Sequence, residues 1–222
     1  MRAVVIGAVG RSFCAGFDLK AAAAGARPDA AGLGRLLQLI TTLPKPVVAA
    51  VDGAVRGGGM GIVAAADVAL ASARASFAFS EVRLGVTPSI ISVVCSRRLA
   101  PWAFSRFALT AEVFPAEEAL RAGLVSELAA DTESLAARVE GLAAAFALAE
   151  PGALAATKDL VRSVGELEPA AAWGAVAGLA ERAFTSAAAA EGIAAFLEKR
   201  PPSWVRPAAD APDVPGGTGR RG

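Results

Sequence analysis

Residues 45–61 read KPVVAAVDGAVRGGGMG, and this stretch sets the expectation for the fold. The apolar run 47–51 predicts a buried strand, because a short apolar run bounded by turn residues is typical of one. Asp52-Gly53 predicts a turn. The glycines at 57–59 then lead into residues 60–66, whose apolar composition predicts a short buried helix. A strand, a turn and a glycine-led helix in so few residues indicate an α/β protein.

The segments on both sides extend this pattern. Residues 3–6 predict a strand, and a glycine-punctuated loop follows over 7–19. Leu33, Leu36, Leu37 and Ile40 have helical spacing, and prolines close that helix. Residues 68–71 and 77–80 alternate as strands do, and from Ser89 onward the chain becomes mostly helical. Strands that alternate with helices predict an α/β core with largely parallel pairing.

Composition excludes several classes of function. The chain has 222 residues, 55% hydrophobic, and a net charge of +1, so a packed core is expected and a nucleic-acid partner is not. The longest apolar uncharged stretch, 84–96, is too short and broken for a membrane span. The absence of histidine excludes Ser-His-Asp and Cys-His sites, and the two cysteines form no CxxC pair, so no metal is expected. A reducing, cytoplasmic compartment fits.

The domain organisation follows from composition along the chain. Residues 1–140 are expected to form the α/β core, and residues 141–206 a C-terminal helical region with breaks at 151–152 and 165. Residues 207–222 are rich in proline and glycine, which predicts a disordered tail.

Two glycine-containing loops are candidates for binding through the backbone. Residues 12–20 read SFCAGFDLK, where a glycine lets a ligand approach the main chain. The run 57–59 exposes N–H groups at the positive end of a helix, which suits an oxyanion. The simpler interpretations are a strand-to-helix connection for the first loop and close helix packing for the second. Neither loop has a nucleotide-binding pattern.

The third candidate is Glu81 in the segment 75–89, ASFAFSEVRLGVTPS. It is expected at the carboxyl end of a strand, the edge at which ligands bind in open α/β sheets. A lone glutamate is more often a solvated surface charge. Without histidine or tyrosine, proton transfer falls mainly to Asp, Glu, Lys or Cys, and Glu81 is the best placed of these.

Together with residues 191–204, EGIAAFLEKRPPSW, these segments resemble the enoyl-CoA hydratase/isomerase (crotonase) family in order and spacing over residues 1–204. The glycine run, the Ser-Glu-Val triplet and PSIIS at 88–92 are closest to the methylglutaconyl-CoA hydratase-like subgroup. The resemblance implies a ββα spiral core followed by a helical trimerisation region. It also implies an acyl-CoA substrate, a homotrimer or hexamer, and no cofactor besides substrate CoA.

The resemblance also assigns roles to single residues. The backbone N–H groups of Phe17 and Gly58 would form the oxyanion hole and Glu81 would transfer the proton. Pro88 and Ile90 would line the acyl pocket. Two further sets are implied for CoA: Phe196 and Lys199, three apart on one helical face and reaching the CoA of a neighbouring subunit, and, at the adenine and phosphate end, Ala15, Asp18, Leu19 and Lys20.

Two departures keep the function open. Family hydratases often carry a first glutamate where this chain has Gly61, and members usually have a β-hairpin and a helix before the strand at 4–6, with no counterpart expected here. Hydration of a 2-enoyl-CoA to a 3-hydroxyacyl-CoA is the function we predict. The alternatives are a 3-enoyl to 2-enoyl-CoA isomerase and a catalytically inactive CoA-binding or assembly subunit.

Overall fold

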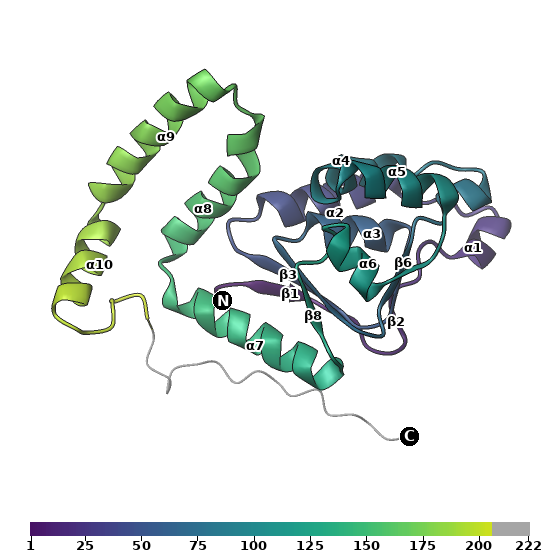
Figure 1. Ribbon diagram of the computed structural model, residues 1–222, viewed down its shortest axis with the longest axis horizontal. Helices are drawn as coiled ribbons and strands as arrows, with labels where there is room; N and C mark the ends of the chain where they lie inside the picture. The colour runs from purple at the N-terminus through teal and green to yellow at the C-terminus, as the bar shows by residue number, and fades with distance from the viewer. Residues whose placement is uncertain (206–222) are drawn as a thin grey trace.

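The computed structural model describes residues 1–205, so the tail expected at 207–222 lies outside the described residues. An α/β core is followed along the chain by three helices over residues 151–197, which we call the arm (Figure 1). The strands are β1 (Val4–Ile6), β2 (Ser12–Cys14), β3 (Val47–Val51), β4 (Ala54–Arg56), β5 (Val68–Ser72), β6 (Ser76–Ala78), β7 (Phe114–Pro115) and β8 (Glu127–Ala129).

Helices lie between the strand pairs, and the described elements after β8 are all helices. They are α1 (Leu19–Ala23), α2 (Ala30–Thr42), α3 (Gly58–Ala65), the 3₁₀ turn η1 (Glu81–Leu84), α4 (Ser89–Arg98), α5 (Pro101–Thr110), α6 (Ala116–Arg121), α7 (Thr132–Leu148), α8 (Pro151–Ser163), η2 (Val164–Glu166), α9 (Pro169–Phe184) and α10 (Ala187–Leu197).

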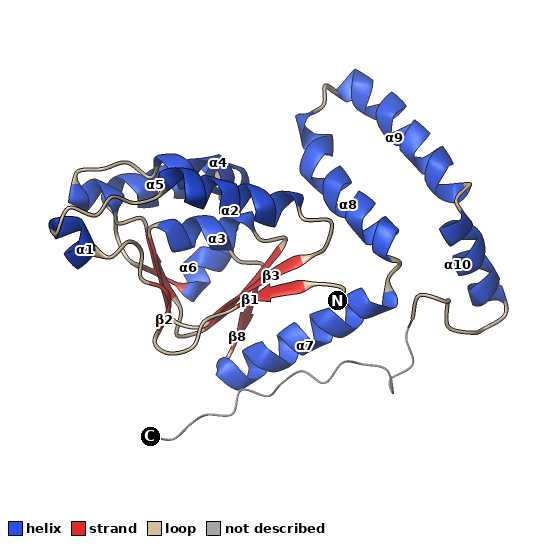
Figure 2. Cartoon of the chain, turned by 180° about the vertical axis from the view of Figure 1, so that it is seen from behind, coloured by secondary structure: helices blue, strands red, loops and turns tan. Residues whose placement is uncertain are grey.

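Two four-stranded sheets form the core (Figure 2). One has the order β1-β3-β5-β8 and the other β2-β4-β6-β7, so the first six strands alternate between the sheets and a helix follows each of these three pairs. All pairings are parallel except β6 with β7. This ββα repetition confirms the predicted α/β spiral core.

The alternation of side chains along β3 explains how the layers are joined. Val47, Ala49 and Val51 point into the main core, which also receives side chains from the second sheet and from α2 to α6. Val48 points the other way and packs with Leu70 and with Leu135 of α7. Since successive strand residues face opposite sides of a sheet, this continuous apolar run buries both faces of the first sheet.

Four local expectations differ from the structure. Glu81 begins η1 and follows the end of β6 at Ala78, so it lies just past the strand and not on it. The sequence predicts Pro115 in the first turn of a helix over 115–122, whereas it ends β7 and precedes α6. The last helical stretch has a further break after Phe184, because Ser186 caps a new helix through its bond from Ala189 N–H.

The fourth correction concerns Lys199. It does not share a helical face with Phe196, because α10 ends at Leu197 and Lys199 has a left-handed φ of 53°. Arg200 N–H then donates to Ala195 O, which closes the helix end. The prolines at 201 and 202 explain this ending, since they cannot continue a helix.

The arm is tied to the core at a few polar contacts. Lys158 of α8 forms an ion pair of 2.8 Å with Asp67, and its Nζ also donates to Ile40 O and Lys45 O. At the far end of the arm, Trp204 Nε1 donates to Leu148 O at 3.1 Å. None of the described helices alone is long and apolar enough to cross a membrane. α7 with the α8–η2 segment passes that test only as a pair bent by 113°, by length and composition.

Candidate functional site

The three sequence motifs meet at Gly57. A Cβ placed on Gly57 would lie 3.7 Å from Gly16 Cα and 3.8 Å from Glu81 Oε1. Gly57 has a φ of 52° and Gly16 a φ of 89°, in the region where a side chain is strained. Glycine at both positions therefore lets the two loops approach each other and the carboxylate.

The predicted oxyanion donors directly follow these two glycines. Phe17 comes after Gly16, and Gly58 is the first residue of α3. Within residues 1–205 neither N–H donates a hydrogen bond to the protein. The first N–H groups of a helix lack partners inside the helix and lie at its positive end. Both N–H groups are thus available to a ligand oxygen.

Glu81 is half-buried and lies near Cys95, a fully buried residue of the core. Burial raises the pKa of its carboxyl group, and the backbone N–H groups of Glu81 and Ser80 oppose part of that rise. Its Oε2 is buried and has no hydrogen-bond partner in the described part of the chain. Burial, together with the charge of Glu81, also raises the pKa of Cys95 to about 12. A buried carboxylate with a free oxygen and a raised pKa is suited to proton transfer.

The glycines of α3 do not all have the same role. A Cβ on Gly59 would meet Cys14 Cβ at 2.6 Å, so Gly59 is required for helix packing. At Gly58 the nearest atom would be Leu33 Cδ2 at 3.3 Å, and the φ there is not left-handed. The packing interpretation of the glycine run therefore holds for Gly59, while Gly58 retains some space.

Gly61, the position of the missing glutamate, is filled by neighbouring helices. A Cβ there would lie 2.6 Å from Ile91 Cγ2 and 3.1 Å from Leu37 Cδ1. The glycine is fully enclosed between α2, α3 and α4. Glu81 is therefore the carboxylate beside the paired glycines, with an apolar wall where a second carboxylate would stand.

Comparisons with known proteins show the family of the chain. The family model described as enoyl-CoA hydratase/isomerase matches residues 1–207. The chain belongs to this family. Carnitinyl-CoA dehydratase from Proteus mirabilis (strain HI4320) is 38% identical over 211 residues, which cover 91% of this chain and 80% of that protein. The corresponding enzyme from Escherichia coli (strain K12) is 36% identical over the same shares.

Solved structures of the family have the same fold. An enoyl-CoA hydratase/isomerase from Marinobacter aquaeolei superposes with a TM-score of 0.85 at 31% identity, covering 93% of this chain and 83% of that one. Pseudomonas aeruginosa AtuE gives 0.84 at 37% identity, covering 92% and 82%. The predicted family, fold class and enzyme class are confirmed. The methylglutaconyl-like subgroup stays a prediction.

The residues that the family resemblance assigns to CoA fall into two places. Ala15, Leu19 and Lys20 are exposed beside the Gly16 loop, and Asp18 caps α1 by accepting from Lys20 N–H at 2.9 Å. Phe196, in α10, and Lys199, just past it, are exposed at the opposite end of the molecule from α1 (Figure 1). One copy of this crotonase-family chain therefore does not bring the two sets together.

The acyl-pocket residues lie at the start of α4. Pro88 and Ile90 are half-buried, and Ile90 Cγ2 would be 4.0 Å from a Cβ on Gly34. Leu33, Leu37 and Ile91 extend the same apolar wall, and the local sequence pattern does not reveal this role. The helical spacing at 33–40 signalled a core face, and only the fold shows which glycines that face meets.

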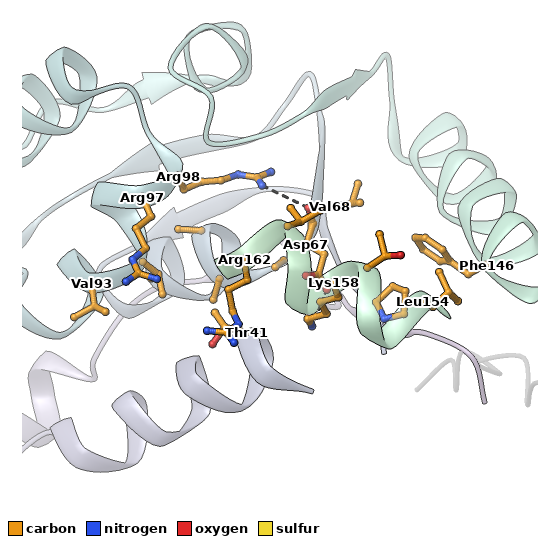
Figure 3. Close-up of a pocket in the computed structure, with 17 residues that line it drawn as sticks. Thr41, Asp67, Val68, Val93, Arg97, Arg98, Phe146, Leu154, Lys158 and Arg162 are labelled. Atoms are coloured by element: carbon orange, nitrogen blue, oxygen red, sulfur yellow. Dashed lines mark hydrogen bonds and ion pairs between the residues drawn. The ribbon is translucent and has the colours of Figure 1, made fainter. Parts of the chain in front are cut away.

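A separate cavity of about 500 Å³ lies at the other end of α3. Figure 3 shows its lining of arginines, Asp67, Lys158 and apolar side chains from α4 and α8. Its cations already have partners: Lys158 with Asp67, Arg97 with Glu166 and Arg162 with Asp159. We interpret it as the junction of arm and core. Among residues 1–205 no cluster of acidic and cysteine side chains could hold a metal.

Proposed function

We propose that this chain hydrates a 2-enoyl-CoA to a 3-hydroxyacyl-CoA. The single observation that carries the proposal is the meeting of Gly16, Gly57 and Glu81, which brings two free N–H groups and one buried carboxylate to the same point. The similarity to carnitinyl-CoA dehydratases supports it, because dehydration of a CoA thioester is the reverse of hydration. The acyl chain is left open.

The reaction needs one base and one oxyanion site. Glu81 accepts a proton from water as the water oxygen bonds to C3 of the enoyl thioester. The electron pair moves to the thioester oxygen, and the N–H groups of Phe17 and Gly58 stabilise the resulting enolate. Glu81 then returns its proton to C2, so one water is added and the carboxylate is restored. Each N–H donor is expected to contribute about 3–4 kcal/mol to the transition state.

The filled position at Gly61 also favours a second candidate, isomerisation of a 3-enoyl-CoA. With one carboxylate in the site, Glu81 could remove a proton from C2 and return it to C4 through the same enolate. The product separates the two reactions, because hydration adds one water to the thioester and isomerisation leaves the mass unchanged.

Assembly completes the proposal. We expect a homotrimer or a pair of trimers in which Phe196 and Lys199 of one copy reach the CoA of the next, since both are exposed on the arm and distant from their own Gly16 loop. The reaction uses no cofactor besides the CoA of the substrate. A cytoplasmic location suits the free thiols of Cys14 and Cys95.

The variant Glu81→Gln tests the proposed base. Turnover of a 2-enoyl-CoA should fall by about 10²-fold or more, while acyl-CoA affinity stays nearly unchanged, because general acid–base groups contribute about 10²–10⁴-fold. Glu117→Gln, an exposed carboxylate on α6, is the matched control and should retain full turnover. Near-normal turnover in Glu81→Gln would remove this residue from the mechanism. Tight acyl-CoA binding without turnover by the unaltered chain would favour an inactive binding subunit.

A further inference from the structure

Arg56 lies between the three segments of the site. It is the last residue of β4, directly before Gly57, and β4 lies between β2 and β6 in the second sheet. β2 leads into the loop that carries Phe17, and β6 leads into η1 with Glu81. A change at Arg56 can therefore reach both oxyanion donors and the base.

The side chain of Arg56 joins β4 to β6. Its Nη1 donates to Ser76 O at 2.7 Å and to Val55 O at 2.8 Å, and its Nη2 donates to Ser76 Oγ at 3.0 Å. The guanidinium is buried enough to lower its pKa. Burying a charge costs free energy that an aliphatic side chain would not cost, and the hydrogen bonds offset part of that cost. The planar fork of arginine is what allows one group to hold several acceptors.

The backbone of Arg56 contacts the remaining segment. Its carbonyl O would be 3.6 Å and its Cβ 3.9 Å from a Cβ on Gly16. Gly16 therefore lies beside the end of β4, where an added methyl group would be in ordinary van der Waals contact with Arg56. A displacement of the end of β4 would shift the loop before Phe17 and the turn at Gly57. Through Ser76 it would also shift β6, the strand that leads to Glu81.

We propose that Arg56 is a positioning residue that fixes the spacing between the Phe17 and Gly58 N–H groups and Glu81. This inference rests on the proposed function. Arg56 acts through the backbone donors, so its loss should weaken polarisation of the bound thioester carbonyl more than it weakens binding. A displacement of about 1 Å in such a donor can lower the rate by roughly 10²-fold.

The test compares Arg56→Met and Arg56→Lys with Arg98→Met. Arg98 is a matched control, because it is a half-buried guanidinium that donates to Leu124 O and Asp67 O, with its pKa lowered by burial, near the other end of α3. The readouts are kcat, KM, thermal melting, and the infrared stretch of an enoyl-CoA labelled with ¹³C at the thioester carbonyl. Ser76→Ala, which removes only the Nη2 contact, is a milder fourth variant.

We expect Arg56→Met to lower kcat by about 10- to 100-fold, with KM within about twofold of the wild-type value. The red shift of the carbonyl stretch when the thioester binds should be smaller than in the wild type. Arg56→Lys should recover part of both, and Arg98→Met should melt earlier with kcat and red shift unchanged. A folded Arg56→Met with wild-type kcat and red shift overturns the proposal. If Arg56→Met does not fold, Ser76→Ala and Arg56→Lys decide by the same two readouts. No red shift and no turnover in the unaltered chain would instead overturn the proposed function and this inference with it.

Discussion

The core and the arm differ in how far their large apolar side chains are buried. The core encloses large side chains such as Phe77, Phe107 and Met60 completely. Beyond Leu135, Ala195 is the only buried hydrophobic residue within the described part of the chain, while Trp173, Phe184 and Phe196 are 78%, 76% and 83% exposed. Exposed apolar surface of this kind marks an interaction site. The core therefore buries its large side chains and holds the candidate site, whereas we propose that the arm packs against another molecule.

The largest effect is expected where the two regions are joined. Lys158→Met removes the ion pair with Asp67 and two hydrogen bonds to backbone carbonyls from a side chain that is 8% exposed. Breaking a fully buried pair typically costs about 3–5 kcal/mol, and because the Asp67 side chain is 28% exposed we expect the lower end, about 3 kcal/mol, or a fall in Tm of roughly 10 °C for a chain of this size. Calorimetry checks this result.

Arg138→Met is the control for Lys158→Met. It breaks the exposed pair with Glu127 and should cost about 0–1 kcal/mol. Equal melting of the two variants would show that the ion pair of Lys158 does not hold the arm to the core.

The next largest effect is expected inside the core, at Gly58. Gly58→Val should lower turnover by roughly 10²-fold through displacement of the donor, and Gly58→Ala should be milder because the φ is not left-handed. The contact of 3.3 Å with Leu33 means that even alanine requires a small shift. Steady-state kinetics with circular dichroism and thermal melting measure the order wild type, Ala, Val. Full turnover by Gly58→Val would make Gly58 a packing glycine.

The proposed role of the arm in assembly is tested by the oligomeric state of the chain. Trp173→Glu combined with Phe184→Glu should convert a trimer-based assembly to monomers, because two charges would be buried in the proposed interface. Light scattering at micromolar concentration measures the mass. Val9→Glu, on a fully exposed loop of the core, is the control and should leave the assembly intact. A wild-type chain that is already a stable monomer would contradict the role given to the arm.

The smallest expected effect is the loss of thermal stability that comes from ionising the half-buried carboxyl group of Glu81. Because the folded pKa of Glu81 is raised, its contribution to stability is fully present below the unfolded pKa and is lost as pH rises through the folded pKa. Glu81→Gln should therefore melt higher than the wild type at neutral pH. The difference should shrink as the pH falls towards 4.5, the ordinary pKa of a glutamate carboxyl group. A difference independent of pH would indicate that ionised Glu81 is not strained by burial.

The sequence predicted the core well because local patterns determine it. The apolar run at 47–51 and the glycine-led helix after it coincide with β3 and α3 to within a few residues. The three motif segments also meet, as the family resemblance implied. What could not be predicted depends on contacts between distant residues. No local pattern reveals that Ile91 and Leu37 fill the space at Gly61, or that Lys158 pairs with Asp67.

The errors in the arm have a similar origin. Helical spacing placed Phe196 and Lys199 on one face, but the prolines after Arg200 end the helix earlier. The break at Ser186 could have been found from its capping side chain, because serine before an alanine run is a helix start signal. Uniform alanine composition hid both boundaries, since it favours helix throughout.

The most direct test of the site is incubation of the wild-type chain with a 2-enoyl-CoA in heavy-oxygen water, followed by mass spectrometry of the thioester. We predict one heavy oxygen at C3 of each product molecule, and its loss in Glu81→Gln but not in Glu117→Gln. A product with a migrated double bond and no heavy oxygen, or a thioester recovered unchanged, would contradict the hydration that we assign to Glu81 and the two backbone donors.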